Sequence, residues 1–229
     1  MDSIKHVSFD CWNTVLFPNP QMHSTRSQWV AHKTGTAPET ISQNFKYYGK
    51  LFDSMEGRTG KSILPEERIY AVIYGISDLQ ISNDFLKQVV DGCNDIALNF
   101  LPMLINVNFP SIISRLKSAG ITVSITCNTG NIPGHILRRI FKKLNCNFDY
   151  YIFSDEVGFA KPSFKIFDEV YNVGVDLWIE EHDLVRRGEI LHVGDSQDAD
   201  IDGALNAGFK SLLFTPATPN YEAIFSFIR

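Results

Sequence analysis

The sequence has few cysteines, and none of them are close together. Its 229 residues contain no CxxC pair, and the four cysteines lie far apart at Cys11, Cys93, Cys127 and Cys146. Such spacing argues against a disulfide framework of the kind found in small secreted domains. We interpret the four side chains as reduced thiols of a cytoplasmic protein.

Long apolar runs and an excess of positive charge are also missing. No segment approaches the roughly 20 apolar residues that a membrane-spanning helix needs, and the opening MDSIKHVSFD has neither the basic region nor the cleavage site of a signal peptide. With 21 basic and 26 acidic residues, the formal net charge is -5. We therefore expect no nucleic-acid or membrane partner, and any phosphate group must be bound locally.

The rest of the composition is typical of a folded α/β protein. Apolar residues make up 44% of the chain, and short apolar runs that read as buried strands alternate with helical patterns. The predicted strands are 6–10, 121–126, 150–154, 190–193 and 210–214. This alternation predicts a Rossmann-like parallel sheet with helices on both faces and with ligands beyond the carboxyl ends of the strands.

One long stretch interrupts the alternation. Between Phe17 and Leu104 there is no convincing strand, and helical patterns recur around Trp29, 45–52, 69–76 and 85–98. We predict a helical cap at 17–104, inserted into a core formed by 1–16 and 105–229. Within it, EGRTGKS at 56–62 lacks the glycine spacing and the preceding strand of a phosphate-binding loop, so we interpret it as a solvated turn.

Acidic residues follow two of the predicted strands. Asp10 ends the first strand in VSFDCWNT, and Asp195 ends a late strand in ILHVGDSQDADIDGA. Either acid alone could simply cap the next helix. Together at one sheet edge they repel each other, and a divalent cation is the usual remedy. Asp200 stands out among the acids that follow Asp195, while Lys161 in AKPSF offers a nearby cation.

In this order, these motifs resemble the haloacid dehalogenase superfamily. Asp10 to Thr14 is similar to its aspartate-x-aspartate-x-threonine loop, and ITVSITCNTG at 121–130 is similar to its second motif, where a strand ends in serine or threonine followed by asparagine. Lys161-Pro162 matches the third motif, and Gly194-Asp195 with Asp200 matches the fourth. The helical insertion also lies where that family places its cap.

The resemblance implies a role for each matching residue. Asp10 would be the nucleophile, and Mg²⁺ would bind to Asp10, to Asp195 and to the backbone carbonyl of Trp12. Thr14 and Asn128 would hydrogen-bond the transferring group, Lys161 would neutralise charge, and Asp200 would orient the groups around the metal. Magnesium and lysine together would cancel the repulsion between a carboxylate and an anionic phosphoryl centre.

Two positions depart from the family pattern. Cys127 stands where serine or threonine is usual, and a thiol is a poor hydrogen-bond donor; Thr126 or Thr129 could compensate in binding the substrate. Trp12 stands where phosphatases of the family have the second aspartate, which protonates the leaving alcohol. An indole ring cannot supply that proton.

These departures leave three functions open. The retained Gly194-Asp195 pair favours a magnesium-dependent phosphatase-type hydrolase for small phosphorylated metabolites with good leaving groups. The missing second acid is also typical of 2-haloacid dehalogenases, which use no metal. The third hypothesis is a homologue without catalysis that binds a phosphorylated ligand or a protein partner.

Overall fold

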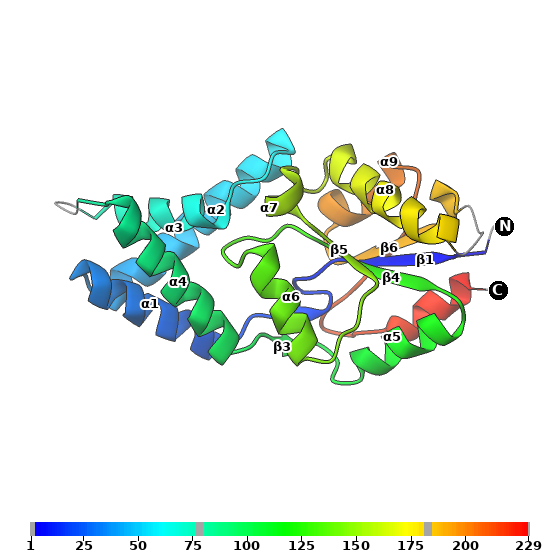
Figure 1. Ribbon diagram of the computed structural model, residues 1–229, viewed down its shortest axis with the longest axis horizontal. Helices are drawn as coiled ribbons and strands as arrows, with labels where there is room; N and C mark the ends of the chain where they lie inside the picture. The colour runs from blue at the N-terminus through cyan, green and yellow to red at the C-terminus, as the bar shows by residue number, and fades with distance from the viewer. Residues whose placement is uncertain (1–2, 77–79, 181–184, 229) are drawn as a thin grey trace.

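The computed structural model describes residues 3–76, 80–180 and 185–228 of the chain. Its centre is a five-stranded parallel sheet with the strand order β5-β4-β1-β6-β7 (Figure 1). The strands are β1 (His6–Phe9), β4 (Thr122–Cys127), β5 (Tyr150–Phe153), β6 (Ile190–Gly194) and β7 (Lys210–Leu213). All five strands predicted from the sequence are confirmed, and so is the α/β fold class.

Helices cover both faces of this sheet because each face is apolar. Helices α5 (Phe109–Ser118) and α6 (Gly134–Lys143) pack on one face, together with the 3-10 segment η3 (Tyr221–Phe227). Helices α8 (Phe164–Glu180) and α9 (Gly203–Asn206) pack on the other (Figure 1). The short helix α7 (Ser154–Val157) and the 3-10 turn η1 (Arg187–Glu189) complete the connections.

A separate group of helices lies beyond the carboxyl ends of the strands (Figure 1). We call α1 (Pro20–Thr34), α2 (Pro38–Thr59), α3 (Pro65–Tyr74) and α4 (Asn83–Asn99) the helical unit. Three of the four begin with proline at the first helical position, where its missing N–H costs nothing. The unit has an apolar core of its own, which includes Val30, Ile69 and Val89.

The chain enters and leaves the helical unit through a feature that the sequence pattern did not reveal. Strands β2 (Leu16–Phe17) and β3 (Met103–Leu104) pair antiparallel, so the two connections lie side by side. The expectation of no strand between Phe17 and Leu104 is therefore wrong at both ends. A two-residue strand is too short to show an alternating pattern. The domain boundaries at 16/17 and 104/105 stay a prediction.

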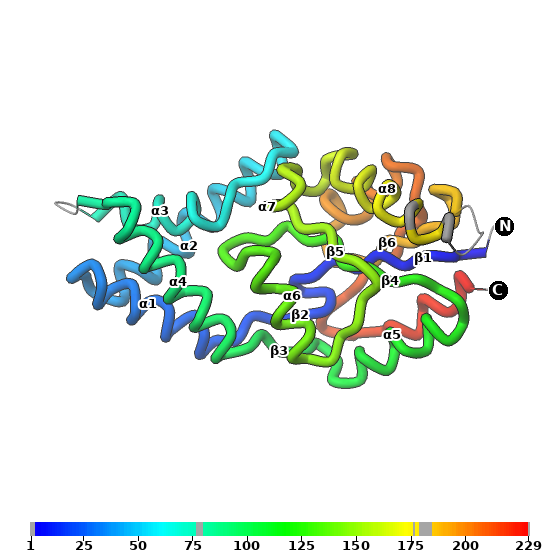
Figure 2. Tube along the Cα trace, in the orientation of Figure 1, coloured from blue at the N-terminus to red at the C-terminus, as the bar shows by residue number. Residues whose placement is uncertain are grey.

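The EGRTGKS segment contacts the core and is not a solvated turn. Helix α2 continues to Thr59 and ends at Gly60, whose φ of 66° is left-handed. After it, Gly60 O accepts a 3.1 Å hydrogen bond from Ala160 N, and Ser62 N donates one of 3.2 Å to Gly158 O. Figure 2 shows the α2–α3 connection beside α7 and the segment that leads to α8. The helical unit is thus joined to the core just before Lys161.

Within the described ranges, no helix is both long enough and apolar enough to cross a membrane.

Candidate active site

The carboxyl ends of β1 and β6 bring the predicted acids together. These strands are neighbours, with Phe9 opposite Val193, so Asp10 and Asp195 leave the sheet at one edge. Carboxylate oxygens of Asp10, Asp195 and Asp200 all lie within 4.8 Å of one another. They line a cavity of about 380 Å³, which we call the acidic cavity. The predicted clustering at the sheet edge is therefore observed.

Asp10 is buried with one oxygen bound and one free. Its Oδ1 accepts a 2.6 Å hydrogen bond from Lys161 Nζ, whereas its Oδ2 is buried without a hydrogen-bond partner. Burial raises the pKa of Asp10 to about 7; Lys161 opposes this rise, and the charges of Asp200 and Asp195 add to it. An unpartnered buried carboxylate oxygen is costly, so this atom is poised for a ligand.

Lys161 bridges two of the acids. Its side chain is 2% exposed, and Nζ lies 2.6 Å from both Asp10 Oδ1 and Asp200 Oδ1. Burial alone would lower the pKa of Lys161, but the two carboxylates hold it above its ordinary value. The cation therefore stays charged and fixes the geometry of both acids.

Asn128 holds the backbone of Lys161. Its Nδ2 donates a 3.1 Å hydrogen bond to Lys161 O, and its Oδ1 accepts one of 2.8 Å from Lys161 N. Asn128 lines the acidic cavity, but the contacts of its side chain are with this loop. Its role toward a transferring group stays a prediction.

Asp200 comes from a π-helical turn, η2 (Gln197–Asp202). Its Oδ2 accepts a 2.9 Å hydrogen bond from Ser196 N. Burial would raise the pKa of Asp200, yet Lys161 and His192 hold it below its ordinary value. Gly194 makes room for this carboxylate, because a Cβ there would lie 2.2 Å from Asp200 Cγ.

A buried polar chain behind Asp200 escaped the sequence analysis. His192 Nε2 lies 3.2 Å from Asp200 Oδ1, His192 Nδ1 lies 3.0 Å from Ser8 Oγ, and Ser8 Oγ lies 2.7 Å from Thr126 Oγ1. Burial lowers the pKa of His192, so the ring is neutral near pH 7. The available signal was polar residues at alternate positions of otherwise apolar strands, as in HVSF and ILHVG.

Asp195 is half-buried and lines the acidic cavity together with Asn13, a residue that the sequence analysis also missed. Burial, followed by the charge of Asp200, raises the pKa of Asp195, while Lys161 and the Asn13 side chain oppose this. Asn13 has a left-handed φ of 59°, which asparagine tolerates better than most residues. The loop after β1 thereby turns the Asn13 amide toward Asp195.

Three other predicted residues lie outside the acidic cavity. Thr14 is fully buried, and its Oγ1 has no hydrogen-bond partner. Cys127 is fully buried in the apolar core. The Thr129 backbone N donates a 3.1 Å hydrogen bond to Ser154 Oγ, and Thr129 lines the neighbouring cavity instead. Their roles toward a substrate stay predictions.

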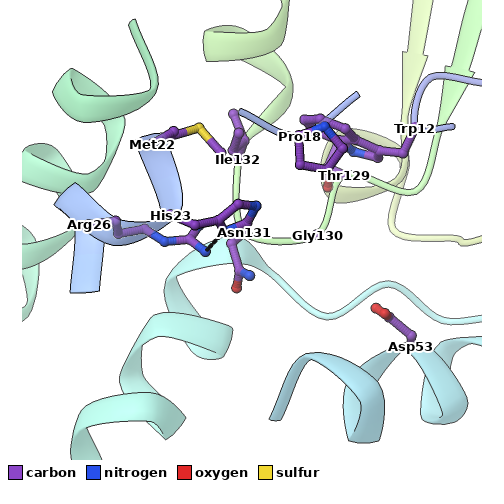
Figure 3. Close-up of a pocket in the computed structure, with 10 residues that line it drawn as sticks. All are labelled: Trp12, Pro18, Met22, His23, Arg26, Asp53, Thr129, Gly130, Asn131 and Ile132. Atoms are coloured by element: carbon purple, nitrogen blue, oxygen red, sulfur yellow. Dashed lines mark hydrogen bonds between the residues drawn. The ribbon is translucent and has the colours of Figure 1, made fainter. Parts of the chain in front are cut away.

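Trp12 forms a wall between two cavities. The half-buried indole packs against the core and lines the acidic cavity. It also lines a second cavity of about 250 Å³, which we call the adjoining cavity (Figure 3). Asp53 and Gly130 are likewise shared by the two cavities. Asp53 comes from α2 and was not anticipated; its carboxylate is 3.0 Å from Arg68 Nη1.

The donor set of the acidic cavity fits a hard divalent cation. Magnesium prefers carboxylate and carbonyl oxygens. The cavity supplies carboxylates from both strand ends, Asp10 after β1 and Asp195 after β6. Asp200 is engaged by Lys161, Ser196 and His192, which leaves Asp10 and Asp195 as the more available ligands.

Comparison with known proteins shows the family to which the chain belongs. A family model described as haloacid dehalogenase-like hydrolase matches residues 4–208. The chain is also 41% identical over 64 residues to the pyrimidine 5'-nucleotidase YjjG of Escherichia coli (strain K12). That match covers 28% of this chain and only 25% of the relative.

Solved structures share the fold over nearly the whole chain. The HAD-hydrolase YfnB from Bacillus subtilis, bound to magnesium, gives a TM-score of 0.69 at 16% identity, with 99% of both chains covered. The L-2-haloacid dehalogenase from Xanthobacter autotrophicus, with chloropropionic acid covalently bound, gives 0.60 at 18% identity and covers 96% of this chain and 80% of that one. At identities this low, the similarity shows a shared fold and nothing about activity. The match of the family model over residues 4–208 shows that the chain belongs to the haloacid dehalogenase-like hydrolases.

Proposed function

We propose that this hydrolase is a magnesium-dependent phosphatase-type enzyme that works through an aspartyl-enzyme intermediate on Asp10. The observation that carries the proposal is the free, buried Oδ2 of Asp10, whose partner oxygen is held by Lys161 at 2.6 Å. A nucleophile needs one oxygen fixed for orientation and the other open to the substrate. Asp10 meets both conditions.

Asp10, Asp195 and the backbone carbonyl of Trp12 would hold the magnesium ion. When bound, it would supply positive charge that draws an anionic phosphoryl group to the carboxylates. Lys161 adds a fixed cation against Asp10, and Asp200 holds that cation from the other side. The pairing of acids with one lysine leaves net negative charge in the cavity, which favours a divalent ion.

The chemical step follows from these positions. A bond forms between Asp10 Oδ2 and phosphorus as the bond from phosphorus to the leaving oxygen breaks, and the electron pair departs with that oxygen. Trp12 has no acidic proton to give it. The proposed substrates are therefore small phosphorylated metabolites whose leaving groups depart as stable anions, such as acyl or aryl phosphates. In the second step, water attacks the phosphorus of the aspartyl phosphate and gives up its proton to solvent, the bond from phosphorus to Asp10 breaks, and phosphate leaves as the carboxylate is restored.

Thr14, Asn128, Cys127 and Thr129 are proposed to contact the substrate. Asn128 lines the acidic cavity and Thr129 lines the adjoining one, which supports this for those two residues. We also propose residues 17–104 as a cap that closes over the site, with its connections near 17–20 and 102–110 as hinges. The YfnB structure, described as revealing interdomain movement, supports a mobile cap.

A substrate screen tests the proposal. Phosphoesters, acyl phosphates and 2-haloacids are incubated with the enzyme, with and without Mg²⁺, and release of phosphate or halide is measured. We expect magnesium-dependent phosphate release, loss of turnover in Asp10→Asn, and weak Mg²⁺ binding in Asp195→Asn by calorimetry. Asp198→Asn, which changes an exposed acid of η2, is the matched control and should behave as wild type.

Other results would replace the proposal with a specific alternative. Halide release without metal would make the protein a 2-haloacid dehalogenase. Tight binding of a phosphorylated ligand without turnover would make it a non-catalytic binder. Full activity in Asp10→Asn would remove Asp10 as the nucleophile.

A further inference from the structure

The helical unit contains a buried guanidinium that has no acid to balance it. Arg26, on α1, is 5% exposed, and it forms no ion pair with any of the described residues 3–76, 80–180 and 185–228. Its Nε is buried without a hydrogen-bond partner. Burial lowers the pKa of Arg26, yet a guanidinium remains protonated in proteins. A buried charge is rarely left without a partner of opposite charge, unless a ligand supplies that charge when it binds.

The groups around Arg26 do not neutralise it. Its Nη2 donates a 3.1 Å hydrogen bond to His23 Nδ1. Burial, followed by the charge of Arg26, lowers the pKa of His23, so the imidazole is neutral near pH 7. The Phe45 ring lies 4.1 Å from the guanidinium carbon and offers only a weak cation–π contact. Neither neighbour carries the negative charge that Arg26 lacks.

Arg26 faces the adjoining cavity, next to the proposed phosphoryl site. Figure 3 shows Arg26 at one end of the cavity and Trp12 at the other, with Asn131 of the loop 129–132 near His23 between them. Trp12 also lines the acidic cavity. Asp53 also lines the cavity, but it lies apart from Arg26 in this view and is paired with Arg68. Met22, Pro18 and Ile132 give the cavity an apolar floor.

We propose that the adjoining cavity is a carboxylate subsite in which Arg26 binds a second anionic group of the substrate. This inference rests on the proposed function and narrows it to phosphorylated carboxylic acids. One guanidinium matches the single charge and planar fork of a carboxylate. The short carbon chain between the two anionic ends lies along Trp12, which borders both cavities.

Matched phosphonates test the subsite. Calorimetry with Mg²⁺ compares phosphonoacetate, 3-phosphonopropionate and 4-phosphonobutyrate with ethyl-, propyl- and butylphosphonate, which lack the carboxylate. We expect the wild-type protein to bind at least one of the carboxylate-bearing phosphonates roughly tenfold or more tightly than its matched alkylphosphonate. This is the size of a charge-assisted hydrogen bond. Arg26→Met should abolish that preference and leave alkylphosphonate binding unchanged.

Controls separate this inference from the proposed function. Lys46→Met removes an exposed cation from α2 and should keep the preference. If the carboxylate-bearing phosphonates bind no more tightly than the matched alkylphosphonates, the subsite alone is overturned. The same holds if their tighter binding survives in Arg26→Met. If no phosphonate binds, the proposed phosphoryl site is wrong, and the subsite is then tested alone with butyrate. NMR saturation transfer to butyrate that is lost in Arg26→Met would support the subsite. No saturation transfer to butyrate in the wild type would overturn it.

Discussion

The two cavities beside Trp12 differ in how their charges are paired. In the acidic cavity, Lys161 is paired with Asp10 and Asp200, and Asp195 adds a third clustered carboxylate. In the adjoining cavity, Arg26 is buried with no ion pair to any described residue, because the acid there, Asp53, is paired with Arg68. The first arrangement calls for a cation and the second for an anion. A substrate with two anionic ends, bound together with a divalent metal, would balance both.

The largest expected effect comes from removing the cation of the acidic cavity. Lys161→Met should lower kcat by about 10²–10³-fold, because a positioned charge that stabilises the reacting group is typically worth that much. Single-turnover release of the leaving group from an acyl phosphate measures the attack by Asp10, which comes before phosphate release. Lys165→Met, which changes an exposed lysine on α8, is the control. Equal losses in both variants would show that the charge of Lys161 is not specific to catalysis.

Changing the wall between the cavities should shift substrate preference. Trp12→Asp places a carboxylate where the leaving group departs, so hydrolysis of alkyl phosphates should rise by roughly tenfold or more, since general acids contribute about 10²–10⁴. Rates on aryl phosphates should change much less. Trp12→Asn has a similar size without the acid and should show no such gain. A wild-type enzyme that already hydrolyses both classes equally would contradict our interpretation of Trp12.

A stability measurement separates the two buried arginines of the helical unit. Arg68 is 2% exposed and is paired with Glu56 at 2.8 Å and with Asp53. Arg68→Met strands the buried Glu56 and should cost about 3 kcal/mol of the free energy of unfolding. Arg26→Met strands no acid and should change it by less than about 1 kcal/mol.

Urea unfolding of the wild type and both variants measures these differences. A loss in Arg26→Met as large as in Arg68→Met would mean that Arg26 has a structural partner and is not a ligand-binding cation.

The sequence predicted the parts of the fold that repeated patterns encode. Each core strand is a run of buried apolar residues, and the acids that follow β1 and β6 had to meet because parallel neighbours end at one edge. The clustering of Asp10, Asp195 and Lys161 could therefore be anticipated. The membership in the family followed from the same motifs.

Contacts between distant segments could not be anticipated in this way. Asp53 reaches the cavities only because α2 docks on the core, and the balance of charge around Arg26 depends on which acids pack nearby. His192 and Ser8 read as irregularities within apolar strands until their hydrogen bonds are seen. Residues Gly60 and Ser62 contact the core through backbone atoms, and backbone contacts leave no pattern in the side-chain sequence.

That docking contact links two equilibria. Gly60 O and Ser62 N are hydrogen-bonded to Ala160 and Gly158, immediately before the lysine that neutralises Asp10. Any excursion of the helical unit that separates these partners also releases one end of the segment carrying Lys161. By thermodynamic reciprocity, whatever stabilises the lysine against the acids also stabilises the docked arrangement, and to the same extent. If the helical unit moves as proposed, its position and the charge environment of Asp10 would therefore be linked through these two hydrogen bonds.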